Sequence, residues 1–258
     1  MIVRVPVAGI DIALQAPTGV EDLLLFEART QDFGVALALL GRLAARVDGQ
    51  PIDWDRVAVT DVDVLLLRLR QLLLGDVVRA DTTCPGAACG ARVDVEFSIG
   101  DFLEHHQPRS AARVGAPDAD GWFRLRSGAA QFRVPRASDE VAIAREAHPE
   151  KALRRLCIRP PDAPPDVRRR AEAAMEAIAP SLCADLEGVC PECGATVACT
   201  FDPLEYTLRE LRDQAALVYD DVCTIARHLH WSEGEILALP TTRRARYAEM
   251  AQHREGRA

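Results

Sequence analysis

Two short stretches, CPGAACG at residues 84–90 and CPECG at residues 190–194, decide how this chain is expected to fold. Both run in the order Cys-Pro, a short spacer and Cys-Gly. Proline presets a turn, and glycine accepts the left-handed backbone conformation that a chain reversal needs just after the second cysteine. Each stretch is therefore typical of a zinc knuckle, a tight turn that presents two thiolates to one metal ion.

The two knuckles together supply a complete ligand set. Structural zinc sites are tetrahedral and closed, and they accept four thiolates with spacers of two to four residues between paired ligands. We therefore predict one structural Zn²⁺ site formed by Cys84, Cys89, Cys190 and Cys193. Residues 90–189 separate the knuckles, far more than the roughly 15–20 residues of an ordinary ribbon. The metal would thus join the two halves of the chain, and its loss is expected to loosen the whole assembly.

Other interpretations of the cysteines stay open. The four could be reduced surface cysteines in loops. Alternatively, Cys190 and Cys193 could be a thioredoxin-like redox pair, but such a pair would open a helix, whereas a strand is predicted after Gly194. The remaining cysteines lie among apolar neighbours and are expected to be small core residues, although Cys183 or Cys199 could replace a ligand. These remaining cysteines are Cys157, Cys183, Cys199 and Cys223.

Strands are predicted on both sides of each knuckle. Val93, Val95 and Phe97 alternate with charged residues, which is the period of a half-buried strand. The predicted strands are 77–83, 91–98, 184–189 and 196–201. A helix precedes each pair, at 61–74 with Thr60 as its cap and at 166–179. The order helix, strand, knuckle, strand, helix therefore occurs twice, either as an internal repeat or as a coincidence of two common hairpin patterns.

The remaining elements are predicted from apolar spacing and from turn residues. The first 14 residues are expected to be an extended arm or strand, and residues 159–165, rich in proline, a surface linker. Residues 204–229 carry apolar side chains at heptad spacing and predict one long helix, followed by a capping box at Ser232 and a helix from Thr241 or Thr242. Further predictions are helices at 21–29, at 33–46 and from Ser138 to about Ala147, and a short strand pair at 122–126 and 131–134.

These elements predict an α+β fold that is mainly helical, with the two knuckle hairpins as a zinc-ribbon-like element and a C-terminal helical segment. We divide the chain into three regions: residues 1–106 with the first knuckle, an irregular middle at 107–165, and residues 166–258 with the second knuckle and the C-terminal helices.

Composition excludes several functional classes. The 258 residues carry a net charge of −8, so no global positive field would hold a nucleic-acid backbone. No apolar run approaches the roughly 18 residues of a membrane span, and the N-terminus lacks the features of a signal peptide, so we expect a cytoplasmic protein with no membrane partner. The chain contains no Walker loop, nucleophile elbow or HExxH motif, and a closed zinc site leaves no position for a catalytic water. We therefore predict that the protein is not an enzyme.

The segment 61–102 resembles the T-even phage baseplate hub assembly chaperone family, which has relatives in phage-like contractile injection systems. The resemblance lies in the run LLLRLR at 65–70, in Gly75-Asp76 and in the first knuckle. Residues 225–240, followed by Arg243-Arg244 through Tyr247, are similar to a C-terminal segment of tail-assembly proteins from such systems. Together these motifs span about half of the chain.

This resemblance implies a non-enzymatic cytoplasmic factor that helps to build the baseplate hub or to load the tape-measure protein, with one of these proteins as its partner. The zinc site would then be a scaffold and the C-terminal helices the partner surface. Exposed aromatic and aliphatic side chains carry interface energy, so the candidate anchors are Tyr219, Leu229, Trp231 and Ile236. A zinc-ribbon regulator that binds nucleic acid through Arg243, Arg244 and Arg246 is the alternative.

Overall fold

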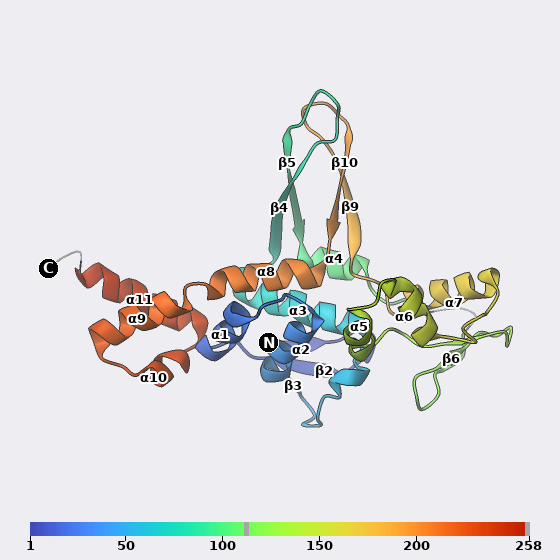
Figure 1. Cartoon of the computed structure of the whole chain (residues 1–258), viewed down its shortest axis with the longest axis horizontal. Helices are drawn as coiled ribbons and strands as arrows, with labels where there is room; N and C mark the ends of the chain where they lie inside the picture. Colours follow the sequence, from blue (N-terminus) through green and yellow to red (C-terminus); the bar gives the residue numbers. More distant parts are fainter. Residues whose placement is uncertain (111–113, 256–258) are drawn as a thin grey trace.

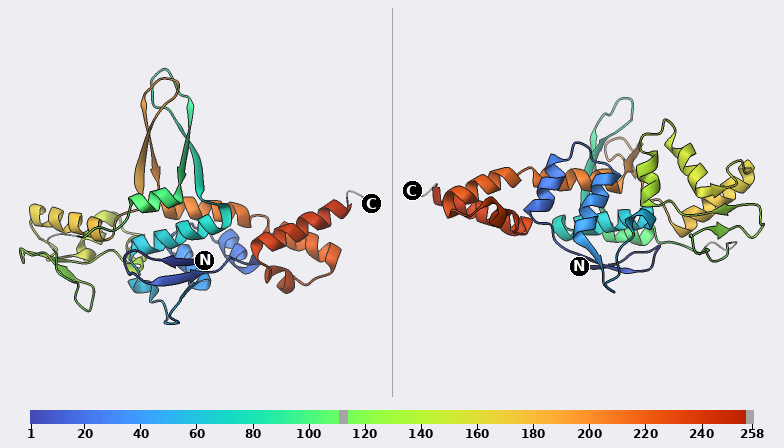
Figure 2. Two further views of the ribbon diagram at one scale, coloured as in Figure 1. Left: turned by 180° about the vertical axis from the view of Figure 1, so that it is seen from behind. Right: turned by 60° about the horizontal axis from the view of Figure 1, so that its bottom comes forward.

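The computed structural model describes residues 1–110 and 114–255. Four parts can be distinguished, which we call the body, the tower, the middle module and the C-terminal arm (Figure 1). The tower rises from the body, while the middle module and the arm lie at opposite ends of the long axis (Figure 2).

The body combines a small sheet with helices from both ends of the chain. Strands β1 (Ile2–Arg4), β2 (Asp11–Leu14) and β3 (Ala44–Arg46) pair antiparallel in the order β1-β2-β3. The body helices are α1 (Gly19–Glu27), α2 (Phe33–Leu43), α3 (Val59–Leu74), α4 (Ile99–His105) and α8 (Pro203–Ala215), with a short 3-10 turn η1 (Trp54–Arg56). The predicted N-terminal extended segment is thus a pair of short strands.

Helix α3 is the centre of the body. The run Leu65–Leu67 and Leu69 are buried, and because successive residues of a helix point in different directions, this burial places α3 inside the body. Arg70 is also buried, and its guanidinium pairs with Glu210 of α8 at 2.8 Å and donates to the carbonyls of Gly75 and Val77. The main core therefore joins residues of the N-terminal region to a segment that begins near Leu182.

The tower consists of two antiparallel hairpins that stand side by side. Strand β4 (Val77–Thr83) pairs with β5 (Arg92–Ser98), and β9 (Ala184–Val189) pairs with β10 (Thr196–Phe201), in register from base to tip. At the base, the ring of Phe201 meets those of Phe97 and Phe102 at centroid distances of 4.9 and 5.2 Å. These strands confirm the predicted hairpins, and the repeated order of helix, hairpin and helix is also observed.

The middle module has a small core of its own. It contains strands β6 (Phe123–Arg124), β7 (Gln131–Phe132) and β8 (Ile158–Arg159), and helices α5 (Ala137–Ile143), α6 (Pro149–Cys157) and α7 (Pro165–Ile178). The proline-rich segment is more than the predicted surface linker, because its first residue pairs with β7 as part of β8 and Ala163 is buried in this core. Helix α7, which we grouped with the third region, packs in the same core.

The prediction of one long helix at 204–229 is wrong, because the structure has two helices there. Helix α8 ends at Ala215, and α9 (Val218–Leu229) begins after a bend at Ala216 and Leu217. Ala215 faces the main core, whereas Ile225 belongs to a separate cluster in the C-terminal arm. The arm is completed by α10 (Glu233–Leu237), which has the predicted capping box, and by α11 (Thr241–Glu255).

Four predicted helices also differ at their ends, and the first of them, α1, spans Gly19–Glu27 instead of 21–29 because Thr18 caps it. Helix α3 begins at Val59 rather than after Thr60, whose hydroxyl donates to the carbonyl of Pro180 at 2.9 Å. Helix α5 begins at Ala137 and ends at Ile143, and Ser138 donates to the carbonyl of Asp55 instead of capping. Helix α2 ends before residues 44–46, because these residues pair with β2.

The α+β class is confirmed, with small antiparallel sheets among a larger number of helices. In the part of the chain that the structure describes, no helix has the length and apolar character needed to cross a membrane.

Candidate metal centre

The four predicted cysteines converge at the tip of the tower. Their sulfur atoms all lie within 4.8 Å of one another. The Sγ atoms of Cys84 and Cys193 are 3.5 Å apart, and those of Cys89 and Cys190 are 3.8 Å apart. Each close pair joins one hairpin to the other, so the cluster connects two segments that are far apart in the sequence.

The two loops that carry these cysteines share one backbone pattern. The N–H of Cys84 donates to the carbonyl of Ala91 at 2.8 Å, and that of Cys190 donates to the carbonyl of Ala195 at 2.9 Å. Gly90 and Gly194, just after the second cysteine of each loop, have φ of 59° and 74°. The prediction that these glycines allow a left-handed reversal is confirmed.

Gly86 is a further residue in close contact with the cluster, and it was not among the predicted site residues. A Cβ atom at this position would lie 3.3 Å from the sulfur of Cys193 and 3.4 Å from that of Cys84. Its N–H also points at the sulfur of Cys84, at 3.4 Å. The signal in the sequence was the Cys-Pro-Gly order, which differs from the Cys-Pro-Glu of the second loop.

Burial divides the four thiols into an inner and an outer pair. Cys84 and Cys190 are buried and pack with Val93 and Val197 in a small apolar cluster below the tip. The other two thiols, of Cys89 and Cys193, are half-buried and exposed, respectively.

Without a cation, these four thiols cannot all ionise. Backbone N–H groups of Cys193 and Glu192 lower the pKa of Cys190 to about 7. Although the N–H of Gly86 favours the thiolate of Cys84, burial and the neighbouring thiols raise its pKa to about 12. Burial and the neighbouring sulfurs thus both oppose a second thiolate, and a bound dication would offset both.

The spacing of the sulfurs fits a tetrahedral metal ion. Four thiolates bonded to zinc at about 2.3 Å lie about 3.8 Å from one another in a regular tetrahedron. The observed distances of 3.5 and 3.8 Å, within an outer limit of 4.8 Å, are close to this value. Because thiols from the chain fill every position, such a site would have a structural role.

Among the other cysteines, the predicted core position is right only for Cys157, which is buried. Burial raises the pKa of its thiol to about 12. Cys199 is half-buried, whereas Cys183 and Cys223 are exposed. Neither Cys183 nor Cys199 belongs to the four-sulfur cluster.

The predicted partner-binding residues differ in how accessible they are. Tyr219 is 44% exposed, packs edge-on against Phe26 and donates to Glu27. Leu229 and Trp231 are half-buried in the cluster of the C-terminal arm. Ile236 is fully buried in that cluster, so it cannot contact a partner while the arm is folded.

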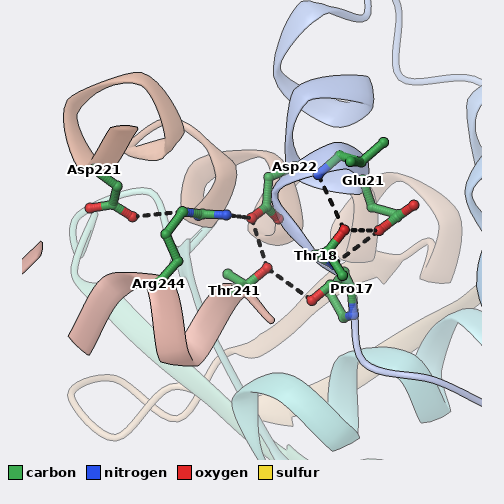
Figure 3. A network of polar contacts seen from close by, with 8 residues as sticks. Pro17, Thr18, Glu21, Asp22, Asp221, Thr241 and Arg244 are labelled. Carbon is green, nitrogen blue, oxygen red and sulfur yellow. Dashed lines mark hydrogen bonds and ion pairs between the residues drawn. The ribbon is translucent and has the colours of Figure 1, made fainter. Parts of the chain in front are cut away.

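The three arginines proposed for nucleic-acid contact do not form one surface either. Arg244 is buried and bridges Asp22 of α1, at 2.6 Å, to Asp221 of α9, at 3.0 Å (Figure 3). The hydroxyl of Thr241 donates to the same carboxylate of Asp22 at 2.7 Å. Arg244 therefore fastens the arm to the body and is not available to a phosphate.

Comparison with models of protein families, with curated proteins and with solved structures finds no match for this chain.

Proposed function

We propose that this protein binds one structural Zn²⁺ ion through Cys84, Cys89, Cys190 and Cys193 and acts as a non-enzymatic assembly factor. The observation that carries the proposal is the four-sulfur cluster, whose spacing suits a tetrahedral ion and whose ligands all come from the chain. A closed site of this kind holds two hairpins together and leaves no position for substrate. The resemblance described above makes a baseplate hub or tape-measure protein of a contractile system the expected partner.

A protein partner fits the tower better than nucleic acid does. The two hairpins carry two arginines and six carboxylates. Both arginines already pair with carboxylates across their own hairpin, Arg79 with Glu96 and Arg92 with Asp81. A zinc ribbon that tracked a phosphate backbone would need the opposite balance of charge.

Metal content tests the first half of the proposal. We expect one zinc ion for each chain of the purified full-length protein, measured by elemental mass spectrometry. The variant Cys190→Ser with Cys193→Ser is expected to lose it, because two thiolates hold the ion far more weakly than four. Cys223→Ser, which changes an exposed cysteine outside the cluster, serves as the matched control. Full zinc occupancy in the double variant would contradict the site.

Co-purification tests the second half. The protein, expressed with its genomic neighbours, is expected to retain a hub or tape-measure protein. An apolar contact should change little with added salt, whereas nucleic-acid binding should weaken steeply as counterions are released. Retention of nucleic acid alone, with a steep dependence on salt, would favour the zinc-ribbon regulator instead.

A further inference from the structure

A second candidate site lies away from the tower, where the middle module meets the body. A cavity of about 280 Å³ opens between α3, α5, α6 and α7. Four of its lining residues are carboxylic acids, Asp63, Glu140, Glu172 and Glu176, and its apolar wall includes Leu153 and Met175. No feature of the metal centre or of the C-terminal arm contributes to this cavity.

Asp63 is the residue that gives the cavity its chemistry. It is only 8% exposed and lines the cavity from α3. Within residues 1–110 and 114–255, no group gives its carboxyl a hydrogen bond or an ion pair. The nearby hydroxyl of Thr60 is already used by the carbonyl of Pro180. A buried carboxyl without a partner destabilises the fold, so its position calls for a ligand that would satisfy it.

Two of the other carboxyl groups in the cavity already have partners. Glu172 pairs with Arg154 at 2.6 Å, and Glu176 accepts a hydrogen bond from the N–H of Ser181 at 3.2 Å. Glu140, on α5, has no such partner among the described residues. The cavity therefore presents two uncompensated carboxyl groups, those of Asp63 and Glu140, beside two that are satisfied.

The two charged groups that act most strongly on Asp63 are both acidic. Burial, and then the charges of Asp202 and Glu140, raise the pKa of Asp63 well above its usual value. Burial, Asp139 and Asp202 likewise raise the pKa of Glu140. The carboxylate of Asp202 caps α8, because it accepts the N–H groups of Leu204 and Glu205. A cation in the cavity would relieve this repulsion.

The shape of the site favours an organic cation over a metal ion. In the described part of the chain, the four-cysteine cluster is the only group of three or more ligand residues with atoms close enough to share a metal ion. The carboxyl groups of the cavity are thus too dispersed for that role. An apolar wall beside carboxylates instead fits a side chain with an aliphatic stem and a charged end. The volume lies just below the range of small-molecule pockets, which suits a single side chain.

We propose that this cavity binds the side chain of an arginine or lysine from a partner polypeptide, with Asp63 and Glu140 receiving the cation. The proposal depends neither on zinc nor on the assembly function. The apolar wall would pack on the methylene stem, and the two free carboxyl groups would accept charge-assisted hydrogen bonds.

Titration of the isotopically labelled full-length protein with N-acetyl-arginine amide and N-acetyl-lysine amide, followed by NMR, tests the site. Amide signals of α3 and α5 should shift, and the neutral analogues with citrulline and norleucine should bind at least ~10-fold more weakly, because a charged hydrogen bond contributes about 1.5–3 kcal/mol. Asp63→Asn should weaken binding of the charged amides by at least ~10-fold. Glu104→Gln, at an exposed position on α4, is the matched control and should leave binding unchanged.

Thermal unfolding is expected to show that Asp63→Asn remains folded, because the amide has the shape of the carboxyl and removes a buried acid.

Calorimetry in two buffers of different ionisation enthalpy adds a second readout. A cation should draw Asp63 into its ionised form, so binding should release more protons from the native protein than from Asp63→Asn, in which Glu140 remains. Equal binding of the neutral analogues or undiminished binding by Asp63→Asn would overturn the proposal. So would the absence of any shift at about 100 mM cation, where even a Kd of about 10 mM gives near-full occupancy. Tighter binding of Ca²⁺ or putrescine than of the two amides would also overturn it.

Discussion

Asp61 shows how one buried side chain can link the stability of the fold to pH. It lies in the first turn of α3, where it is fully buried, and its carboxylate accepts the N–H groups of Val7 and Ala8 at 2.8 and 2.9 Å. Burial raises the pKa of Asp61 to about 6, although these two hydrogen bonds oppose the shift. The native state therefore holds this proton more tightly than the unfolded chain does.

The stabilising contribution of this shift is present below pH 4 and is lost as the pH rises through about 6. The native protein should lose about 2–3 kcal/mol of this contribution between pH 4 and pH 7, whereas Asp61→Asn should not, because asparagine does not titrate. The free energy of unfolding of Asp61→Asn, minus that of the native protein, should therefore rise by this amount across the range. Urea unfolding across this range measures the difference, with Asp101→Asn as an exposed control on α4. A difference that stays constant with pH would contradict the assignment.

Arg244 shows why some residues of a site could not be identified from the sequence. Arg243, Arg244 and Arg246 look alike as a basic cluster, yet only Arg244 is both buried and paired with two carboxylates. One of these, Asp22, lies 222 residues earlier in the chain. Local sequence carries no information about such a partner. The burial of Ile236 was missed for a similar reason, since it depends on how α9, α10 and α11 pack.

Removal of the Arg244 guanidinium should release the arm. Arg244→Met is expected to lower the free energy of unfolding by about 3–5 kcal/mol, because it leaves Asp22 and Asp221 buried without a cation. Arg246→Met, which breaks an exposed pair with Glu249, should cost about 1 kcal/mol or less. Chemical denaturation compares the two variants. Equal losses would mean that the buried network does not hold the arm.

At the scale of elements, the hairpins could be predicted and the break between α8 and α9 could not. Strand periodicity and the Cys-Gly turns are local signals, and both hairpins follow them. At the break, Ala216 has φ and ψ of −57° and −24°, and Leu217 has −84° and −2°. Both residues have nearly helical angles, and the heptad spacing of apolar residues continues across them. The sequence therefore contains no signal of the bend. The change of direction depends on two separate cores, which only the tertiary structure defines.

The tower is expected to depend on the metal more than the body does. Its tip cluster is separate from the main core, which contains α3 and the aromatic residues at the base of the hairpins. The sequence alone predicted that metal loss would loosen the whole assembly, but the separate clusters lead us to expect loosening at the tip of the tower only. A strong chelator should speed amide hydrogen exchange at the tip by at least ~10-fold and leave α3 protected, because the two regions can open separately. Exchange followed by mass spectrometry measures this, with Cys223→Ser as the control chain. Equal acceleration in α3 would show that the metal stabilises the molecule as one unit.

At the scale of the whole molecule, one body supports three features at separate places: the metal centre, the acidic cavity and the C-terminal arm. The cavity was not predicted, because its carboxyl groups come from helices far apart in the sequence. The clustering of the four cysteines was predicted, because paired cysteines in tight turns are a local pattern. Separate placement also means that the proposed partner surface of the arm can be tested without changing the four-cysteine cluster.

Tyr219 is the predicted anchor best placed for that test. Its ring is exposed beside Phe26, at the junction of the arm and the body. If the arm is the partner surface, Tyr219→Ala should weaken binding of a hub or tape-measure protein by about 10- to 100-fold, the range typical of an aromatic hot spot. Zinc content should not change, because the residue is remote from the tower.

Tyr219→Phe should retain most of the affinity, since it keeps the ring and loses only the hydrogen bond to Glu27. Val141→Ala, at an exposed apolar position on α5, controls for a general loss of surface. Undiminished binding by Tyr219→Ala would move the partner surface away from this junction, whereas loss of zinc in the same variant would show that the arm and the tower are coupled through the body.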